Sequence, residues 1–409
     1  AATTNAAVTG NTLVINNISL TGNAYGGIGL NIAQTAGAAP NNPNVVKMNG
    51  GAVTGSVVGA RSSAGGVTNG GAELAGGTVT AGTDGVALAG GRGQTSAINN
   101  VVTITGGIVK GAIYGGYADN SGAKTTGNNV YLGDSNGTYT ANLSQASLYG
   151  GNDSDYKNNH LHVRAKNITA DSAKNFNTYD FHLNTGISAG NTMLTLTNNN
   201  DALGRTVNWS EINLDATGWS GKGVNAQNQS VQNYFGDVGT VTLMADGNTA
   251  TNRSSNLRLS NALGRTGWDG DYEYHIGLRT KPNIATSTTR DYVDAELHRY
   301  QNANHIHTGA LSGRNTIYGG YSIWVNKVVQ DNELTLNNAT GFTEAYGGFT
   351  STGADAVRNK LTLNSGTVGS LYGGVAAGAG LVDDNHVIVN DGTVTADIYG
   401  GRSTGTGSV

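Results

Sequence analysis

The 409-residue sequence contains no cysteine and only three prolines. Without cysteine, disulfides, thiolate metal sites and cysteine nucleophiles are all excluded. The scarcity of proline suits a body of continuous β-sheet, because proline removes a donor from the sheet's hydrogen-bond ladder. No run of residues is apolar for the roughly 18 positions that a membrane-spanning helix needs. No charged-then-apolar signal segment opens the sequence either, so we expect a mature segment or a part of a longer protein.

Charge is also sparse, since Asp, Glu, Lys and Arg make up only 12% of the chain and the net charge is -4. Disordered chains combine low hydrophobicity with high net charge, whereas here Val, Ile and Leu recur at regular intervals. There is no basic run, so we expect no nucleic-acid partner. Glycine is the abundant residue, with 64 copies, about twice ordinary usage.

A repeated unit accounts for much of this glycine. An aromatic residue precedes two glycines in "GAIYGGYA", "NTIYGGYS" and "GSLYGGVA", and the tyrosines at this position are Tyr25, Tyr114, Tyr149, Tyr318, Tyr346, Tyr372 and Tyr399. Most units open with an asparagine, namely Asn11, Asn44, Asn100, Asn304, Asn332, Asn359 and Asn385. Apolar residues stand two and four places after the asparagine, which is the period of a strand with one buried face.

Such a unit cannot bury its apolar face alone, so successive units must stack. The sequence therefore predicts an all-β fold, a parallel β-helix (β-solenoid), right-handed, with about 27 residues per coil. The chain length allows on the order of 15 coils and a body roughly 70 Å long at ordinary strand spacing.

The repeated residues suggest structural roles. We expect the two glycines to form a sharp corner, because glycine adopts positive φ without penalty. Aromatic residues of successive coils are expected to stack, and the asparagines are expected to form an amide ladder at the opposite corner. An exposed tyrosine row that binds sugars is the functional alternative.

The repeat divides the chain into three parts. Residues 1–151 and 301–409 carry regular arrays, whereas the motif disappears in residues 152–300. We favour a decorated continuation of the solenoid for this middle block over a separate subdomain, because its strands keep their alternation.

The middle block also concentrates aromatic residues, which are Trp209, Trp219, Trp268, Tyr272 and Tyr274. Loops on a rigid scaffold commonly carry recognition, and aromatic side chains dominate contact energy at interfaces. These five residues are therefore candidates for ligand binding, and the alternative is that they fill or cap the core.

Several carboxylates and histidines have a spacing that could support chemistry. Short acidic clusters that could serve acid–base sugar chemistry are Asp153 with Asp155, Asp269 with Asp271 and Glu273, and Asp383 with Asp384. Two histidine pairs at i, i+2 project to one face of a strand: His160 with His162, and His305 with His307. Neither pair has an evident third metal ligand, so solvated turn carboxylates and outward polar faces are the simpler interpretations. We assign no catalytic residue, metal or cofactor.

The units "N-x-V-x-V-x-x-G-x-V-x-x-x-I-Y-G-G", followed by "AKNFNTYDFHLNTGISAGNTMLTLTNNN", resemble passenger regions of large bacterial autotransporter (type V secretion) adhesins. The resemblance covers the repeat arrays and the start of the middle block. It implies surface display or secretion, with a signal peptide and a C-terminal outer-membrane barrel that are not in this sequence.

We therefore expect a non-enzymatic adhesin or stalk at the cell surface, presenting loops to a host or bacterial surface glycan or protein. A self-associating fibre or surface-layer component is the alternative, because uncapped solenoid ends can stack. A polysaccharide-acting enzyme using Asp269 or Asp271 is a third possibility.

Overall fold

The computed structural model describes residues 8–29, 43–153, 155–198, 201–219, 238–247, 257–260, 264–283, 288–310, 315–323 and 326–409. These residues form β-strands almost throughout, with one short 3-10 helix, η1 (Trp209–Glu211). Parallel strands stack into a β-solenoid of about 11 turns with roughly 28 residues per turn, which confirms the predicted fold class. In these ranges no helix has the length and apolarity needed to cross a bilayer.

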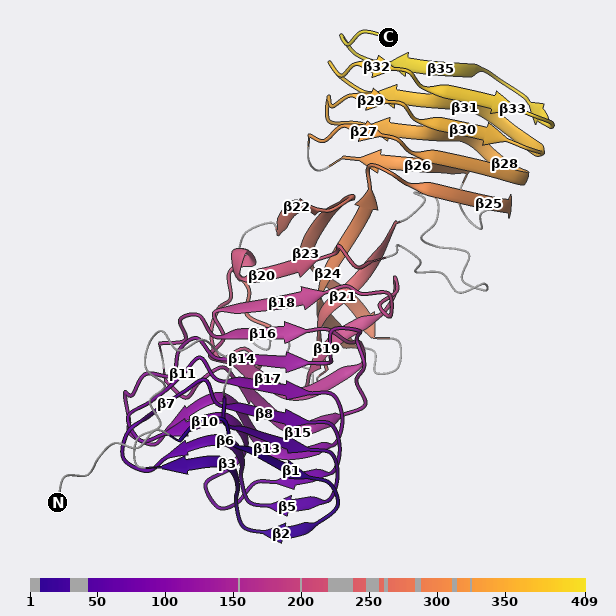
Figure 1. The fold of residues 1–409 in the computed structure, drawn as a ribbon. Coiled ribbons are helices and arrows are strands. Elements are labelled where there is room, and N and C mark those ends of the chain that lie inside the picture. The colour runs from indigo at the N-terminus through magenta and orange to yellow at the C-terminus, as the bar shows by residue number, and fades with distance from the viewer. Residues whose placement is uncertain are drawn as a thin grey trace, which may run out of the picture.

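The first stack, indigo to magenta in Figure 1, has one wall of parallel strands in the order β1-β4-β8-β12-β14-β16-β18-β20. Their bounds are β1 (Thr12–Ile15), β4 (Val45–Met48), β8 (Gly71–Leu74), β12 (Val101–Ile104), β14 (Asn129–Leu132), β16 (His160–Val163), β18 (Thr178–His182) and β20 (Ile212–Asp215). Val102 lies between Ala72 and Val130 of the neighbouring coils and has no exposed surface. The core is thus built from residues at equivalent places in successive coils, as predicted.

A second sheet forms the remaining wall of this stack. Its parallel strands are β2 (Ser19–Thr21), β3 (Ala24–Gly29), β5 (Ala52–Thr54), β6 (Val57–Ser62), β9 (Thr78–Thr80), β10 (Val86–Gly93), β13 (Ile108–Ala118), β15 (Asn142–Tyr149), β17 (Ile168–Lys174), β19 (Thr192–Leu196) and β21 (Val238–Asp246). A small side sheet pairs β7 (Gly66–Thr68) with β11 (Ser96–Ile98).

The middle block changes character after β21. The coils continue in parallel through β20 and β21, but β22 (Arg265–Asp269), β23 (Tyr272–Asn283) and β24 (Thr288–Arg299) pair antiparallel with one another and with β21. Antiparallel hairpins use chain length without adding coils. This is one reason why there are about 11 turns rather than the 15 that chain length alone allowed.

The second stack, orange to yellow in Figure 1, has a hydrophobic core of its own that includes Ile317, Leu334 and Leu363. Its main strands are β25 (Asn304–Ala310), β26 (Thr316–Ser322), β28 (Glu333–Thr350), β30 (Lys360–Leu363), β31 (Gly366–Ala376), β33 (His386–Val389), β34 (Thr393–Val394) and β35 (Ile398–Ser403). A third wall consists of β27 (Val329–Gln330), β29 (Ala356–Val357) and β32 (Val382–Asp383).

The expected asparagine ladder is present in both stacks. Asn332 donates from Nδ2 to Oδ1 of Asn359 at 2.8 Å, and Asn359 donates in the same way to Asn385 at 2.9 Å. Equivalent bonds join Asn11 to Asn44 at 2.9 Å and run from Asn100 onward to Asn128 and Asn159. The assignment of Asn304 to this series is wrong, because the backbone N–H of Ala303 occupies that place and donates to Asn332.

The paired glycines do not form the corner that we expected. Gly115 and Gly116 lie inside β13 and do not have positive φ. A Cβ on Gly116 would lie 2.6 Å from Oδ1 of Asn128, so glycine is needed there because the asparagine ladder packs directly on the strand. The ladder is therefore beside the glycines and not at an opposite corner.

The left-handed corner is instead at the residue before the ladder asparagine. Asn99, Asn158, Asp331 and Arg358 have φ between 53° and 57°, although none is glycine. Asn and Asp tolerate this conformation better than most side chains do. The backbone can therefore turn at this position and enter the strand that follows the ladder asparagine, without a glycine at the corner.

The tyrosines stack as predicted. Ring centroids are 4.9 Å apart for Tyr318 and Tyr346, 4.6 Å for Tyr346 and Tyr372, and 5.2 Å for Tyr372 and Tyr399. In the first stack Tyr114 and Tyr149 lie 4.7 Å apart. Tyr25 instead pairs in register with Val58, where the motif is degraded.

A second aromatic position, three residues after the first, is not evident from the sequence pattern. Tyr117 occupies it in the first stack and contacts Tyr114 edge-on at 4.9 Å, whereas Tyr321 and Phe349 occupy it in the second stack and stack on each other. Tyr346 and Tyr372 are only 8% and 4% exposed, so their ring faces are covered by each other and are not open for sugar stacking.

Candidate functional site

Four of the five aromatic candidates of the middle block are buried. Trp209, Trp219, Tyr272 and Tyr274 belong to the core of the first stack. The indole N–H of Trp219 donates to the carbonyl of Ile187 at 3.1 Å. The core-filling interpretation therefore describes these four side chains.

Trp268 is the exposed member of the group, at 55%. The ammonium of Lys327 lies 3.7 Å from its ring centroid, which is a cation–π contact.

The carboxylates proposed for sugar chemistry hold the chain in place. Asp269 accepts from the backbone N–H of Ala216 at 2.6 Å, and Asp271 accepts from the side chains of Gln301 and Asn302 at 3.1 Å. Glu273 is fully buried and accepts from the hydroxyl of Ser322. Each of these groups already has a structural partner.

The two histidine pairs differ in direction. His305 and His307 stand in register with Leu334 and Leu336 on the inward face of β25, while Ile306 between them is 66% exposed. The expectation of an outward polar face is therefore wrong for this pair, and burial lowers the pKa of His307.

His160 and His162 do face outward from β16, and the next strand brings the partners that the sequence did not reveal. His182 of β18 lies with Nε2 3.3 Å from Nδ1 of His162. Asp180 of β18 lies 3.4 Å from Nδ1 of His160, and Asp215 of β20 lies 3.1 Å from Nδ1 of His182. We call these five residues the histidine row.

The hydrogen-bond directions in the row assign its protons. Nε2 of His162 lies 3.1 Å from the acceptor Oδ1 of Asn129, so the Nε2 proton of His162 is present and its Nδ1 accepts. The donor to that Nδ1 is Nε2–H of His182, whose Nδ1 faces the carboxylate of Asp215. Both ring nitrogens of His182 are therefore engaged within the row.

The pKa shift of His162 agrees with a neutral ring that carries its proton on Nε2. Burial is the largest cause that lowers the pKa of His162 to about 4; Asp180 opposes this shift, and the adjacent His182 contributes to it. Burial would raise the pKa of Asp180, but hydrogen bonds from His160, Asn213 and Thr178 outweigh it and lower the pKa. His162 is therefore neutral and Asp180 ionised at neutral pH.

A hollow of about 260 Å³ opens beside the row. It is lined by Ser135, Arg164, His182, Leu183, Asn184, Asp215, Thr217 and Gly218. The side chain of Asp215 is 48% exposed, and the guanidinium of Arg164 lies 4.3 Å above the ring of Tyr131. The hollow therefore offers donors and acceptors side by side, at the ends of β16, β18 and β20 and in the segments that follow them.

Metal ligation was a further possibility for the histidines. Within the described ranges, no group of three His, Asp or Glu side chains has the arrangement of a metal centre.

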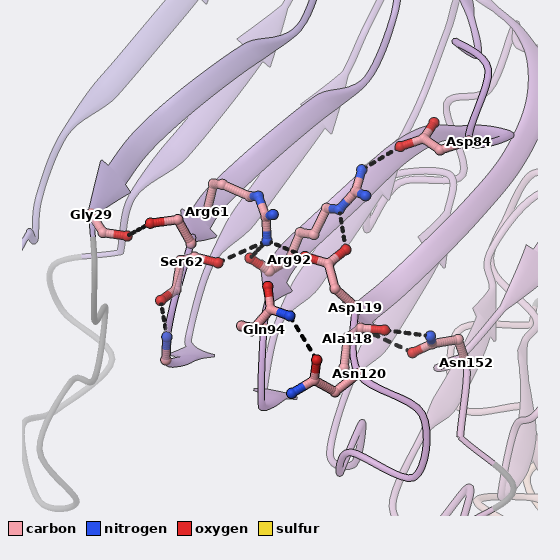
Figure 2. A network of polar contacts seen from close by, with 12 residues as sticks. Gly29, Arg61, Ser62, Asp84, Arg92, Gln94, Ala118, Asp119, Asn120 and Asn152 are labelled. Atoms are coloured by element: carbon pink, nitrogen blue, oxygen red, sulfur yellow. Dashed lines mark hydrogen bonds and ion pairs between the residues drawn. The ribbon is translucent and has the colours of Figure 1, made fainter.

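A second polar cluster lies near the ends of β6, β10 and β13 (Figure 2). Arg61 and Arg92 stand one above the other on neighbouring coils, and Asp119 lies 2.7 Å from the first and 2.9 Å from the second. Arg92 also pairs with Asp84. The carboxylates neutralise two stacked like charges, so this network stabilises the coil edge.

No family model, curated protein or solved structure matches the chain.

Proposed function

We propose that this protein is a non-enzymatic attachment rod, an adhesin or stalk exposed outside a bacterial cell. The hollow beside the histidine row is the observation that carries the proposal. It combines donors from Arg164 and Asn184 with an acceptor on Asp215. Sugar hydroxyl groups both donate and accept hydrogen bonds, so a saccharide is the class of ligand that such a lining suits.

Rigidity supports the same proposal. Parallel neighbours in register fix β16, β18 and β20, and Arg164, His182, Asn184 and Asp215 lie at or within two residues of the ends of these strands. A solenoid also separates its two ends by the summed height of its coils, which suits a stalk.

The test is binding of the full 409-residue chain to glycan and matrix-protein arrays. We expect saccharide retention that falls roughly tenfold or more in Arg164→Ala, because a charged hydrogen bond contributes about 1.5–3 kcal/mol. Arg358→Ala is the matched control, since Arg358 lies on the outer face of the second stack and pairs with Asp331. Absence of any retained saccharide, or equal loss in both variants, would contradict the proposal.

An enzyme acting on polysaccharides is less well supported, because Asp269 and Asp271 are engaged with backbone and amide donors. Glycan turnover that is abolished by Asp269→Ala with the fold intact would favour the enzyme instead.

A further inference from the structure

Arg164 differs from the other arginines of the protein. Within the part of the chain that the structure describes, its guanidinium contacts the ring of Tyr131 but makes no hydrogen bond and no ion pair. Every other arginine with a described side chain donates to an oxygen of the protein, namely Arg61, Arg92, Arg205, Arg258, Arg265, Arg299, Arg358 and Arg402. The hollow beside the histidine row is therefore lined by a cation whose donors are not used.

The position of this cation is nevertheless fixed. The guanidinium lies 4.3 Å from the ring centroid of Tyr131, and that ring stacks on His162 at a centroid distance of 4.3 Å. Gly133 leaves room beside the stem of Arg164, because a Cβ there would lie 3.1 Å from Cβ of Ala165 and 3.4 Å from Cβ of Arg164. A cation–π contact holds the charge without a hydrogen-bond acceptor, so the N–H donors stay available to a ligand.

The carboxylate that lines the same hollow does not neutralise Arg164. Asp215 accepts from the backbone N–H and the hydroxyl of Thr217 at 3.1 and 2.6 Å, and its ion pair is with His182. Burial would raise the pKa of Asp215, but hydrogen bonds from Thr217 and His182 outweigh it and lower the pKa. Asp215 is therefore ionised at neutral pH and engaged with other partners.

We propose that the ligand of the hollow is an acidic saccharide, whose carboxylate or sulfate ester binds the guanidinium of Arg164. This inference rests on the proposed function, since it takes a saccharide as the ligand. The fork of an arginine can donate two parallel hydrogen bonds to an anionic group. Hydroxyl groups of the same sugar suit Asn184 and Asp215. The negative charge of Asp215 would repel an anion at its own side, so the ligand has one favoured orientation.

The experiment measures binding of the full 409-residue chain to immobilised oligosaccharides by biolayer interferometry. Uronic-acid oligosaccharides are paired with their carboxyl-reduced forms, and sulfated oligosaccharides with their desulfated forms. We expect an acidic form to bind roughly tenfold or more tightly than its neutral partner, because the neutral form cannot accept a charge-assisted pair of hydrogen bonds. The pair that shows this difference identifies the anionic group, and added salt should reduce the difference.

Variants of one side chain assign the preference to Arg164. Arg164→Gln should bind the acidic form no more tightly than the neutral one, whereas Arg164→Lys keeps the charge without the fork and should retain part of the preference. Arg358→Gln is the matched control, since Arg358 lies on the second stack and pairs with Asp331.

The outcomes separate this inference from saccharide binding itself. Equal binding of acidic and neutral forms by the unaltered chain would overturn the inference and leave the proposed function standing. A preference for acidic forms that survives in Arg164→Gln would do the same. A chain that retains no saccharide of either kind would overturn both.

Discussion

Removal of one interior rung of the asparagine ladder tests whether the ladder stabilises the stack. Asn359 is fully buried, accepts from the N–H and Nδ2 of Asn332, and donates to the carbonyl of Val329 at 2.9 Å. Asn359→Ala would leave three of these partner groups without a hydrogen bond. Each buried group left unsatisfied costs about 1–3 kcal/mol, so we expect a loss of about 3–5 kcal/mol after local relaxation.

A second asparagine of the same coil provides the matched control. Asn364 bonds to Asn337 at 2.9 Å and accepts from Asn390 at 2.8 Å, but this outer ladder is open to water. Asn364→Ala should cost less than about 1 kcal/mol, because water replaces the lost amide.

The assay is urea unfolding followed by circular dichroism, with amide hydrogen exchange across β30 and β31 to localise the change. Coils of a solenoid interact mainly with their neighbours, so lost protection should be greatest next to the altered rung. If the two variants destabilise the protein equally, hydrogen bonding in the buried ladder is not what holds the coils in register.

Three more outcomes follow from the same structure. Gly116→Ala should lower the free energy of unfolding by about 1–3 kcal/mol, because its Cβ would overlap Asn128; Gly82→Ala, where the nearest atom is 3.7 Å away, should change the urea midpoint little. Tyr372→Ala should cost about 3–5 kcal/mol through the loss of a buried ring stacked on both sides, whereas Tyr372→Phe keeps both stacks and should melt close to the unaltered chain. Stability should fall as the pH drops from 6.5 to about 4, because the unfolded chain binds a proton there that neutral His162 does not. The loss should approach about 3 kcal/mol, and His162→Gln should flatten this part of the pH profile in thermal melts.

The aromatic motif shows how a correct pattern can have a different physical cause. The sequence predicted that Tyr-Gly-Gly recurs once per coil, and the stacked rings confirm it. The glycines are nevertheless in an extended strand, where Gly116 makes room for Asn128. A glycine that recurs in the sequence indicates that no side chain is tolerated at that position. The sequence does not show whether the reason is the backbone conformation or a steric overlap with a neighbouring residue.

The structure of the middle block was the hardest part of the fold to predict from the sequence. The shift from parallel coils to the antiparallel strands β22, β23 and β24 has no periodic signature, because hairpins pair residues that are not one repeat apart. Burial of Trp209 and Trp219 follows from that change, and neither composition nor spacing distinguishes such residues from exposed recognition aromatics.

What the sequence determined by itself was the repeat, the inward columns and the stacking partners along them. In a solenoid, each residue contacts the equivalent residue of the next coil. The period of the sequence therefore identifies which residues are in contact. The histidine row and the role of the paired glycines depended on tertiary structure. They join residues such as His162 and His182, which the regular period does not relate, and only the folded coils bring them within hydrogen-bonding distance.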